Sequence, residues 1–84
     1  MAHVKIYTVD YCPYCFRAKE LLERKGVAFE EVDVTSDPKT RAWLVTATGR
    51  RTVPQTFIDG KPVGGCDDLH DLEDSGQLDK LLAG

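Results

Sequence analysis

The sequence lacks the long apolar runs and basic clusters that mark two large classes of protein. No uninterrupted apolar stretch in its 84 residues approaches the roughly 20 residues needed to cross a bilayer. Its 11 Lys and Arg residues are spread among 14 Asp and Glu residues, giving a net charge of −3. Nucleic-acid affinity rests on clustered positive charge, which this chain does not have. We therefore expect no nucleic-acid partner and no membrane partner.

The number of cysteines is small and odd. The chain has three cysteines, Cys12, Cys15 and Cys66, whereas a secreted disulfide scaffold of this size would carry a larger, even set. The first residues pass directly into alternating polar and apolar positions, so we also expect no secretory leader. These features favour a cytoplasmic protein. In a reducing compartment a Cys-x-x-Cys pair is either part of a metal site or a redox-active dithiol.

A chain of this length has room for one domain, and we expect residues 1–84 to form it. Apolar periodicity and turn signals predict elements in the order β-α-β-α-β-β-α-α. The first β-α-β unit requires a parallel strand pair, and Asp59-Gly60 predicts a two-residue hairpin. One mixed four-stranded sheet with helices on both faces satisfies both connections. The predicted strands cover residues 3–8, 28–34, 54–58 and 61–63; the predicted helices cover residues 13–25, residues 38–48, a segment opening at residue 65 and a short segment with Leu78, Leu81 and Leu82.

The Cys-x-x-Cys pair falls where a predicted strand gives way to a helix. Cys12 is at or just before the helix cap, where free backbone N–H groups and the positive end of the helix dipole favour a thiolate. Cys15 lies three and seven residues before Ala18 and Leu22, so it shares their inward face. We therefore expect Cys12 to be the exposed sulfur that attacks and Cys15 the covered sulfur that resolves a mixed disulfide.

A zinc site is the competing interpretation of these cysteines. Cys66 and His70 would complete a set of three cysteines and one histidine with the Cys-x-x-Cys pair. Structural zinc sites usually take their ligands from loops and short turns, whereas Cys15 lies inside a predicted helix. We therefore expect no metal ligand in this chain.

The chain contains three motifs that match one known family: Cys12-Pro13-Tyr14-Cys15, Thr52-Val53-Pro54-Gln55 and Gly64-Gly65-Cys66-Asp67-Asp68-Leu69. Together they resemble the glutaredoxin family, in its small bacterial dithiol form. The resemblance runs from about residue 4 to residue 82, nearly the whole chain. It implies a thioredoxin-like fold and an enzyme that exchanges thiols and disulfides, with glutathione as co-substrate and no bound cofactor. The implied partners are glutathione and proteins that are glutathionylated or contain disulfides, and the implied state is a monomer.

The resemblance also implies a glutathione site. Val53 precedes a proline, which favours an extended backbone able to pair with glutathione as an added strand would, and the resemblance implies a cis Val53–Pro54 bond. Free N–H groups where the third helix begins suit the γ-glutamyl carboxylate, and Asp67 would hold the neighbouring ammonium. Arg41 would pair with the glycyl carboxylate. The implied glutathione-binding residues are Tyr14, Arg41, Thr52, Val53, Pro54, Cys66 and Asp67.

Two points of the resemblance stay open. The family often has a lysine three residues before the nucleophile, where this chain has Val9 followed by Asp10. The missing positive charge and the added negative one should weaken stabilisation of the thiolate. Asp68 would serve either glutathione or only the dipole of the third helix.

Two other functions fit part of the same pattern. A thioredoxin-like reductant fed by thioredoxin reductase would share the fold and the dithiol, but would have no use for a γ-glutamyl site at residues 64–67. A metal or iron–sulfur binding module would use the cysteines as ligands. The three motifs together favour a glutathione-dependent thiol–disulfide oxidoreductase.

Overall fold

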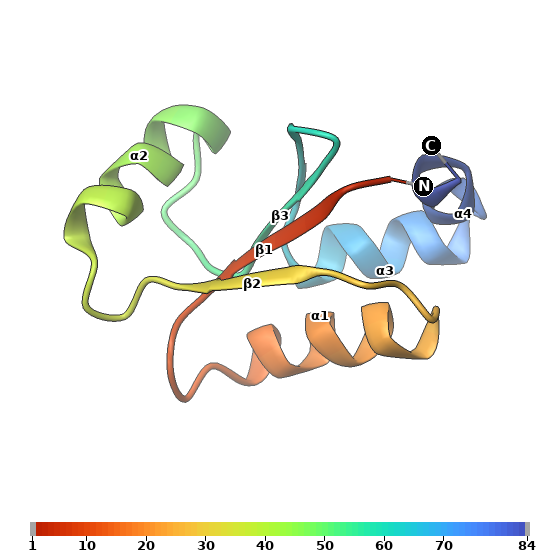
Figure 1. Ribbon diagram of the computed structural model, residues 1–84, viewed down its shortest axis with the longest axis horizontal. Helices are drawn as coiled ribbons and strands as arrows, with labels where there is room; N and C mark the ends of the chain where they lie inside the picture. Colours follow the sequence, from red (N-terminus) through yellow and green to blue (C-terminus); the bar gives the residue numbers. More distant parts are fainter. Residues whose placement is uncertain (1, 84) are drawn as a thin grey trace.

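The computed structural model describes residues 2–83, whose elements follow the predicted order (Figure 1). The second strand is shorter than the predicted residues 28–34. Its pairing with the first strand, its only neighbour in the sheet, runs from Lys5↔Glu30 to Thr8↔Asp33, where the first strand ends. The strands are β1 (Val4–Thr8), β2 (Glu30–Asp33), β3 (Gln55–Ile58) and β4 (Lys61–Gly64); the helices are α1 (Pro13–Arg24), α2 (Pro38–Thr48), α3 (Cys66–Asp74) and α4 (Gln77–Leu82).

The four strands form one mixed sheet in the order β2-β1-β3-β4. β1 pairs with β2 in parallel, whereas β1 with β3 and β3 with β4 are antiparallel. Asp59 and Gly60 have φ angles of 52° and 80°, as the predicted two-residue turn requires. Pro62 lies in the edge strand β4, where a missing N–H costs little. The predicted sheet is thus confirmed.

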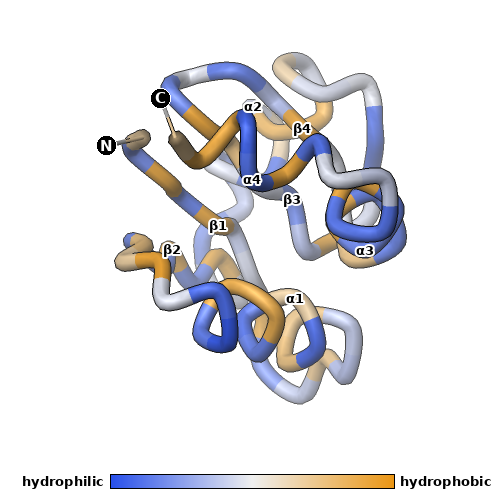
Figure 2. Tube along the Cα trace, turned by 90° about the vertical axis from the view of Figure 1, so that its right-hand side faces the viewer, coloured by the Kyte–Doolittle hydropathy of each residue, from blue (hydrophilic) through white to orange (hydrophobic). Residues whose placement is uncertain are grey.

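Helices cover both faces of the sheet, and each face has its own apolar cluster. Figure 1 shows α1 and α3 on one face and α2 on the other, and Figure 2 shows apolar and hydrophilic segments alternating along α1. Because side chains alternate along a strand, β1 sends Ile6 to the first face and Tyr7 to the second. The larger cluster contains Val4, Ile6, Ala18, Leu21, Leu22, Ile58, Cys66, Leu69 and Leu78, and the smaller one Tyr7, Val34, Leu44 and Phe57.

Local capping signals set the helix ends that build the site. Asp37 accepts a hydrogen bond from the Thr40 N–H at 3.1 Å and so begins α2 as predicted. Gly65 is the N-cap of α3, directly after β4. Among residues 2–83, no helix has the length and apolar character to span a bilayer.

Candidate active site

The sulfur of Cys12 caps helix α1. Cys12 has an extended backbone, with φ −106° and ψ 106°, and its Sγ accepts a hydrogen bond from the Cys15 N–H at 3.3 Å. Pro13 follows at the first helical position, where its missing N–H leaves no donor unsatisfied. A thiolate at this Sγ therefore gains from a backbone donor and from the positive end of the helix dipole.

Cys12 is less exposed than the sequence predicted. The exposed fraction is 9% for Cys12 and 2% for Cys15. The cover comes from the segment between α2 and β3, since the Val53 carbonyl oxygen lies 3.9 Å from Cys12 Sγ. The prediction that Cys12 is exposed was thus wrong, because Cys12 is largely buried. Cys12 is nevertheless the more accessible of the two cysteines.

Cys15 lies on the inward face of α1 with Ala18 and Leu22, as the helical spacing predicted. Burial, and then the hydrogen bond to Cys12, raise the pKa of Cys15 to about 12. Lys19 and the Val9 backbone favour the Cys15 thiolate but do not outweigh burial. Cys15 is therefore a neutral thiol at neutral pH.

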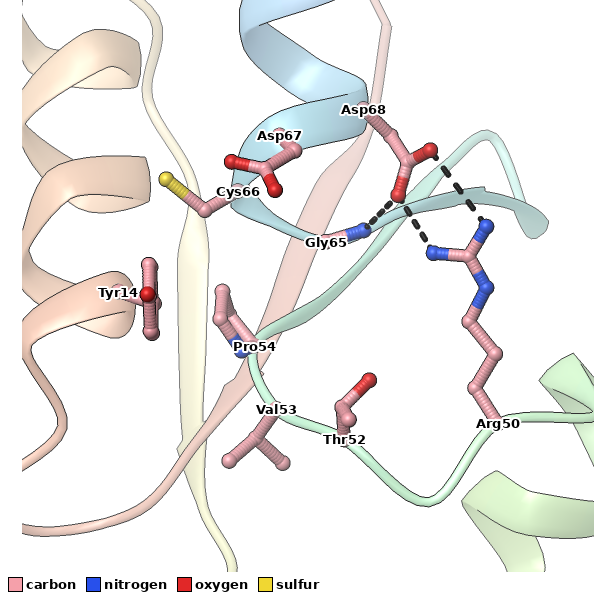
Figure 3. Close-up of a pocket in the computed structure, with 9 residues that line it drawn as sticks. All are labelled: Tyr14, Arg50, Thr52, Val53, Pro54, Gly65, Cys66, Asp67 and Asp68. Atoms are coloured by element: carbon pink, nitrogen blue, oxygen red, sulfur yellow. Dashed lines mark hydrogen bonds and ion pairs between the residues drawn. The ribbon is translucent and has the colours of Figure 1, made fainter.

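A pocket of about 230 Å³ lies between the start of α1, the segment that leads into β3, and the start of α3 (Figure 3). Figure 3 shows Tyr14 and Cys66 toward one end and Arg50 at the other. Cys12 borders the pocket through its contact with Val53. The lining residues are Tyr14, Arg50, Thr52, Val53, Pro54, Gly65, Cys66, Asp67 and Asp68.

The pocket gathers every glutathione residue expected from the sequence except Arg41. Arg41 lies on α2 and donates from Nη2 to the Arg51 carbonyl oxygen at 3.4 Å. The Val53–Pro54 peptide bond is cis, as the resemblance implied. Arg50 was not expected to line the pocket. The sequence carries no local signal for it, since its partner, Asp68, follows 18 residues later.

Asp68 serves the start of α3 and holds Arg50 in place. Its Oδ2 accepts a hydrogen bond from the Gly65 N–H at 2.9 Å and pairs with Arg50 Nη1, while its Oδ1 accepts from Arg50 Nη2 at 3.4 Å. These bonds, chiefly that to Arg50, hold the pKa of Asp68 below its usual value. Of the two roles left open by the sequence, the geometry favours stabilisation of the start of α3 over a contact with glutathione.

Replacing Asp68 with asparagine should destabilise the protein in a pH-dependent way. The pKa of Asp68 is lower in the folded chain than its unfolded value of about 3.9, so the carboxylate adds stability above that pH. This contribution is lost as the pH falls through the folded pKa. The difference in free energy of unfolding between native protein and Asp68→Asn should therefore narrow from pH 7 to pH 3 in urea unfolding. A difference in free energy of unfolding that stays constant with pH would show that the charge of Asp68 does not stabilise the fold.

Cys66 is a buried thiol next to His70. Its Sγ lies 3.6 Å from His70 Nδ1, and the same Nδ1 is 2.8 Å from the Cys66 carbonyl oxygen. Burial, and then the neighbouring Asp67, raise the pKa of the Cys66 thiol. Within residues 2–83, no group of three or more His, Cys, Asp or Glu side chains is arranged to hold a metal ion.

Comparisons with known proteins point to one family. The family model described as Glutaredoxin matches residues 4–63. A glutaredoxin of Pseudomonas aeruginosa is 54% identical over 83 residues, covering 99% of both chains. Glutaredoxin 3 of Escherichia coli K12 is 51% identical over 82 residues, covering 98% of this chain and 99% of the relative.

Solved structures of glutaredoxins have the same fold. The solution structure of glutaredoxin from Brucella melitensis superposes with a TM-score of 0.88 at 55% identity, covering 98% of this chain and 89% of that one. A buckwheat glutaredoxin–glutathione complex superposes with a TM-score of 0.92 at 32% identity, covering 98% of this chain and 77% of that one.

Proposed function

Because this chain belongs to the glutaredoxin family, whose members are thiol–disulfide oxidoreductases with a thioredoxin-like fold, we propose that Cys12 is its nucleophile and Cys15 its resolving thiol. One observation carries this assignment. The Cys15 N–H is bonded to Cys12 Sγ, while Cys15 itself is buried and has a raised pKa. One sulfur is thus placed to react as a thiolate, and the other is held as a thiol until it is needed.

We propose that the pocket binds glutathione, the molecule named in the complex of the buckwheat relative. The backbone of Val53 offers an N–H and a carbonyl to the glutathione backbone, as an added strand would. The first N–H groups of α3, at Cys66 and Asp67, suit the γ-glutamyl carboxylate. The Asp67 carboxylate suits the neighbouring ammonium. The proposed contacts are Tyr14, Thr52, Val53, Pro54, Cys66 and Asp67, with Arg41 acting from outside the pocket.

For a glutathionylated protein, the Cys12 thiolate attacks the glutathione sulfur of the mixed disulfide. The sulfur–sulfur bond breaks, the protein leaves as a thiolate that takes up a proton, and Cys12 carries the glutathionyl group. The thiolate of a second glutathione then attacks that glutathionyl sulfur. Cys12 is released, and glutathione disulfide forms from the substrate's glutathionyl group and one free glutathione, so each turnover consumes one glutathione.

For a disulfide within a protein, the second step passes through Cys15. Cys12 first forms a mixed disulfide with the substrate, and Cys15 then attacks the Cys12 sulfur, releasing the reduced protein and closing a Cys12–Cys15 disulfide. The high pKa of Cys15 means that it gives up its proton as it attacks, and the departing substrate thiolate is the adjacent acceptor. Two glutathione molecules reopen the disulfide.

We also propose that the protein works as a monomer in the cytoplasm. Three segments of a single chain complete the pocket, so a second copy is not needed to form it. A Cys-x-x-Cys dithiol that must return to its reduced form suits a reducing compartment.

A coupled assay tests this function. With cysteine–glutathione disulfide as substrate, we expect rapid NADPH oxidation when glutathione and glutathione reductase supply electrons. Thioredoxin reductase in their place should support little turnover. The reverse result would favour the thioredoxin-like reductant.

Replacing Arg41 with alanine should raise KM for cysteine–glutathione disulfide about threefold and leave kcat unchanged. Its charge lies beside the segment leading into the pocket and would attract the glycyl carboxylate equally in ground and transition states. Arg24→Ala, at the far end of α1, removes the same charge and is the control. An unchanged KM, or an equal rise in both variants, would show that Arg41 does not bind the glycyl carboxylate.

A further inference from the structure

Two aromatic side chains next to the cysteines are exposed and lie outside the pocket. Tyr11 directly precedes Cys12 and is 96% exposed, and Phe16 directly follows Cys15 and is 62% exposed. Neither residue lines the pocket. We call Tyr11 and Phe16 together the aromatic surface. Two large exposed rings beside a reactive sulfur point to a binding role.

The aromatic surface lies on the β2 side of Cys12. Lys19 Nζ is 4.9 Å from the centre of the Phe16 ring and 3.0 Å from a carboxylate oxygen of Glu31, which belongs to β2. The pocket is instead built from the entry to β3 and the start of α3. β2 and β4 are the two edges of the sheet, so Phe16 lies toward one edge and the pocket toward the other.

Tyr11 has a backbone conformation that is unfavourable for a bulky residue. Its φ of 55° is in the left-handed region, which a bulky residue rarely adopts. Asp59 is the one other non-glycine residue in the described part of the chain with a positive φ, and it lies in the hairpin turn. Asparagine tolerates this conformation better than tyrosine, so the fold alone does not explain a tyrosine here.

Two carboxyl groups lie beside the aromatic surface. Asp10 precedes Tyr11, and its backbone N–H donates to Thr35 Oγ1 at 2.8 Å, while the Thr35 N–H donates to Asp33 Oδ1 at 2.8 Å at the end of β2. The neighbouring cation, Lys19, is paired with Glu31 at 3.0 Å. This region is therefore apolar with an excess of negative charge, which would attract a basic side chain.

We propose that the aromatic surface binds the polypeptide half of a glutathionylated protein substrate, and that it fits a segment with an apolar side chain beside the modified cysteine and a basic side chain facing Asp10 and Asp33. The inference rests on the proposed function. A mixed disulfide has two halves that meet at the bond Cys12 attacks. When glutathione fills the pocket, the polypeptide continues outside it, where the exposed Tyr11 and Phe16 flank the two cysteines.

Three substrates distinguish binding of the polypeptide at the aromatic surface from the thiol–disulfide exchange at Cys12. The first is a peptide with leucine and lysine beside its glutathionylated cysteine, the second has serine and glycine in those places, and the third is cysteine–glutathione disulfide. In the native protein, kcat/KM should be about tenfold higher for the first peptide than for the second. Tenfold corresponds to about 1.4 kcal/mol, the scale of one good aromatic contact.

A double variant tests the residues themselves. Tyr11→Asn with Phe16→Ser should lower kcat/KM for the leucine–lysine peptide about tenfold and leave turnover of cysteine–glutathione disulfide unchanged. The asparagine fits the backbone at residue 11, and residue 16 is exposed, so the fold should be retained. Val45→Ser, which removes an exposed apolar side chain from α2 on the other face of the sheet, is the control and should change neither rate.

Each other result has a defined meaning. A double variant that keeps the native preference for the leucine–lysine peptide would overturn the inference. An equal loss on cysteine–glutathione disulfide would also overturn it, because the two residues would then support the fold or the chemistry. If the native protein fails to turn over cysteine–glutathione disulfide at all, the proposed function is wrong and the inference falls with it.

Discussion

Replacing Cys12 with serine should abolish both deglutathionylation and the reduction of protein disulfides. A serine hydroxyl is not ionised at neutral pH, so the hydrogen bond from the Cys15 N–H and the helix dipole would have no anion to stabilise. We expect kcat/KM for cysteine–glutathione disulfide to fall on the order of 10³-fold or more, as is common when a nucleophile is lost. The glutathione-coupled assay measures this loss.

Replacing Cys15 with serine should separate the two reactions. Deglutathionylation should survive, because a second glutathione resolves the intermediate on Cys12. Reduction of a peptide with an internal disulfide should fall by roughly 100-fold or more, since the neighbouring thiol is lost together with its high effective concentration. The same preparation should therefore be active in one assay and nearly inactive in the other.

Cys66→Ser is the comparison for both cysteine variants. Its proposed contact with glutathione is through the backbone, so both reactions should be largely retained. Survival of activity in Cys12→Ser, or loss of deglutathionylation in Cys15→Ser, would contradict the proposed roles. If Cys66→Ser removed only the reduction of internal disulfides, Cys66 would be the resolving thiol.

Replacing Gly64 with alanine should lower the stability of the fold and weaken glutathione binding together. Gly64 has a φ of 108°, and a Cβ there would overlap the carboxyl group of Asp68. Asp68 cannot withdraw without losing its bonds to the Gly65 N–H and to Arg50. We expect the free energy of unfolding to fall by about 2–4 kcal/mol, with about 1–3 from the strained backbone and about 1 from the lost cap.

Gly26→Ala is the matched control for the cost of backbone strain. Gly26 also has a positive φ, 69°, but nothing lies within 4 Å of an added Cβ. Urea unfolding should therefore show a larger loss for Gly64→Ala than for Gly26→Ala. KM for cysteine–glutathione disulfide should rise only in Gly64→Ala, because displacing Asp68 and Arg50 would change the shape of the pocket that they line. Equal losses of stability would show that the overlap with Asp68 has no effect.

The elements of the fold could be predicted because their signals are local. Asp37 caps α2 and precedes a proline, Asp59-Gly60 forms the hairpin turn, and Cys15 shares the spacing of the buried face of α1. Each signal needs only a few neighbouring residues, and none depends on how distant segments pack. The ends of β2 were less well predicted, because they depend on which residues of the distant strand β1 pair with it, from Lys5 to Thr8.

Contacts between distant segments could not be predicted in the same way. The Val53 carbonyl that covers Cys12 lies 41 residues away in the sequence, so spacing around the cysteines gave no sign of it. The pair of Arg50 with Asp68 joins two segments 18 residues apart. The resemblance to a family supplied the motif around Val53, but it did not assign this pair.

The two open edges of the sheet are poor templates for aggregation. β2, at one edge, carries exposed carboxylates at Glu30, Glu31 and Asp33, so a second copy aligned there would bring like charges together. β4, at the other edge, has exposed Lys61 and Pro62, and the proline offers no N–H to an incoming strand. The carboxylates of β2 and the proline of β4 therefore disfavour the recruitment of further copies at either edge of the sheet.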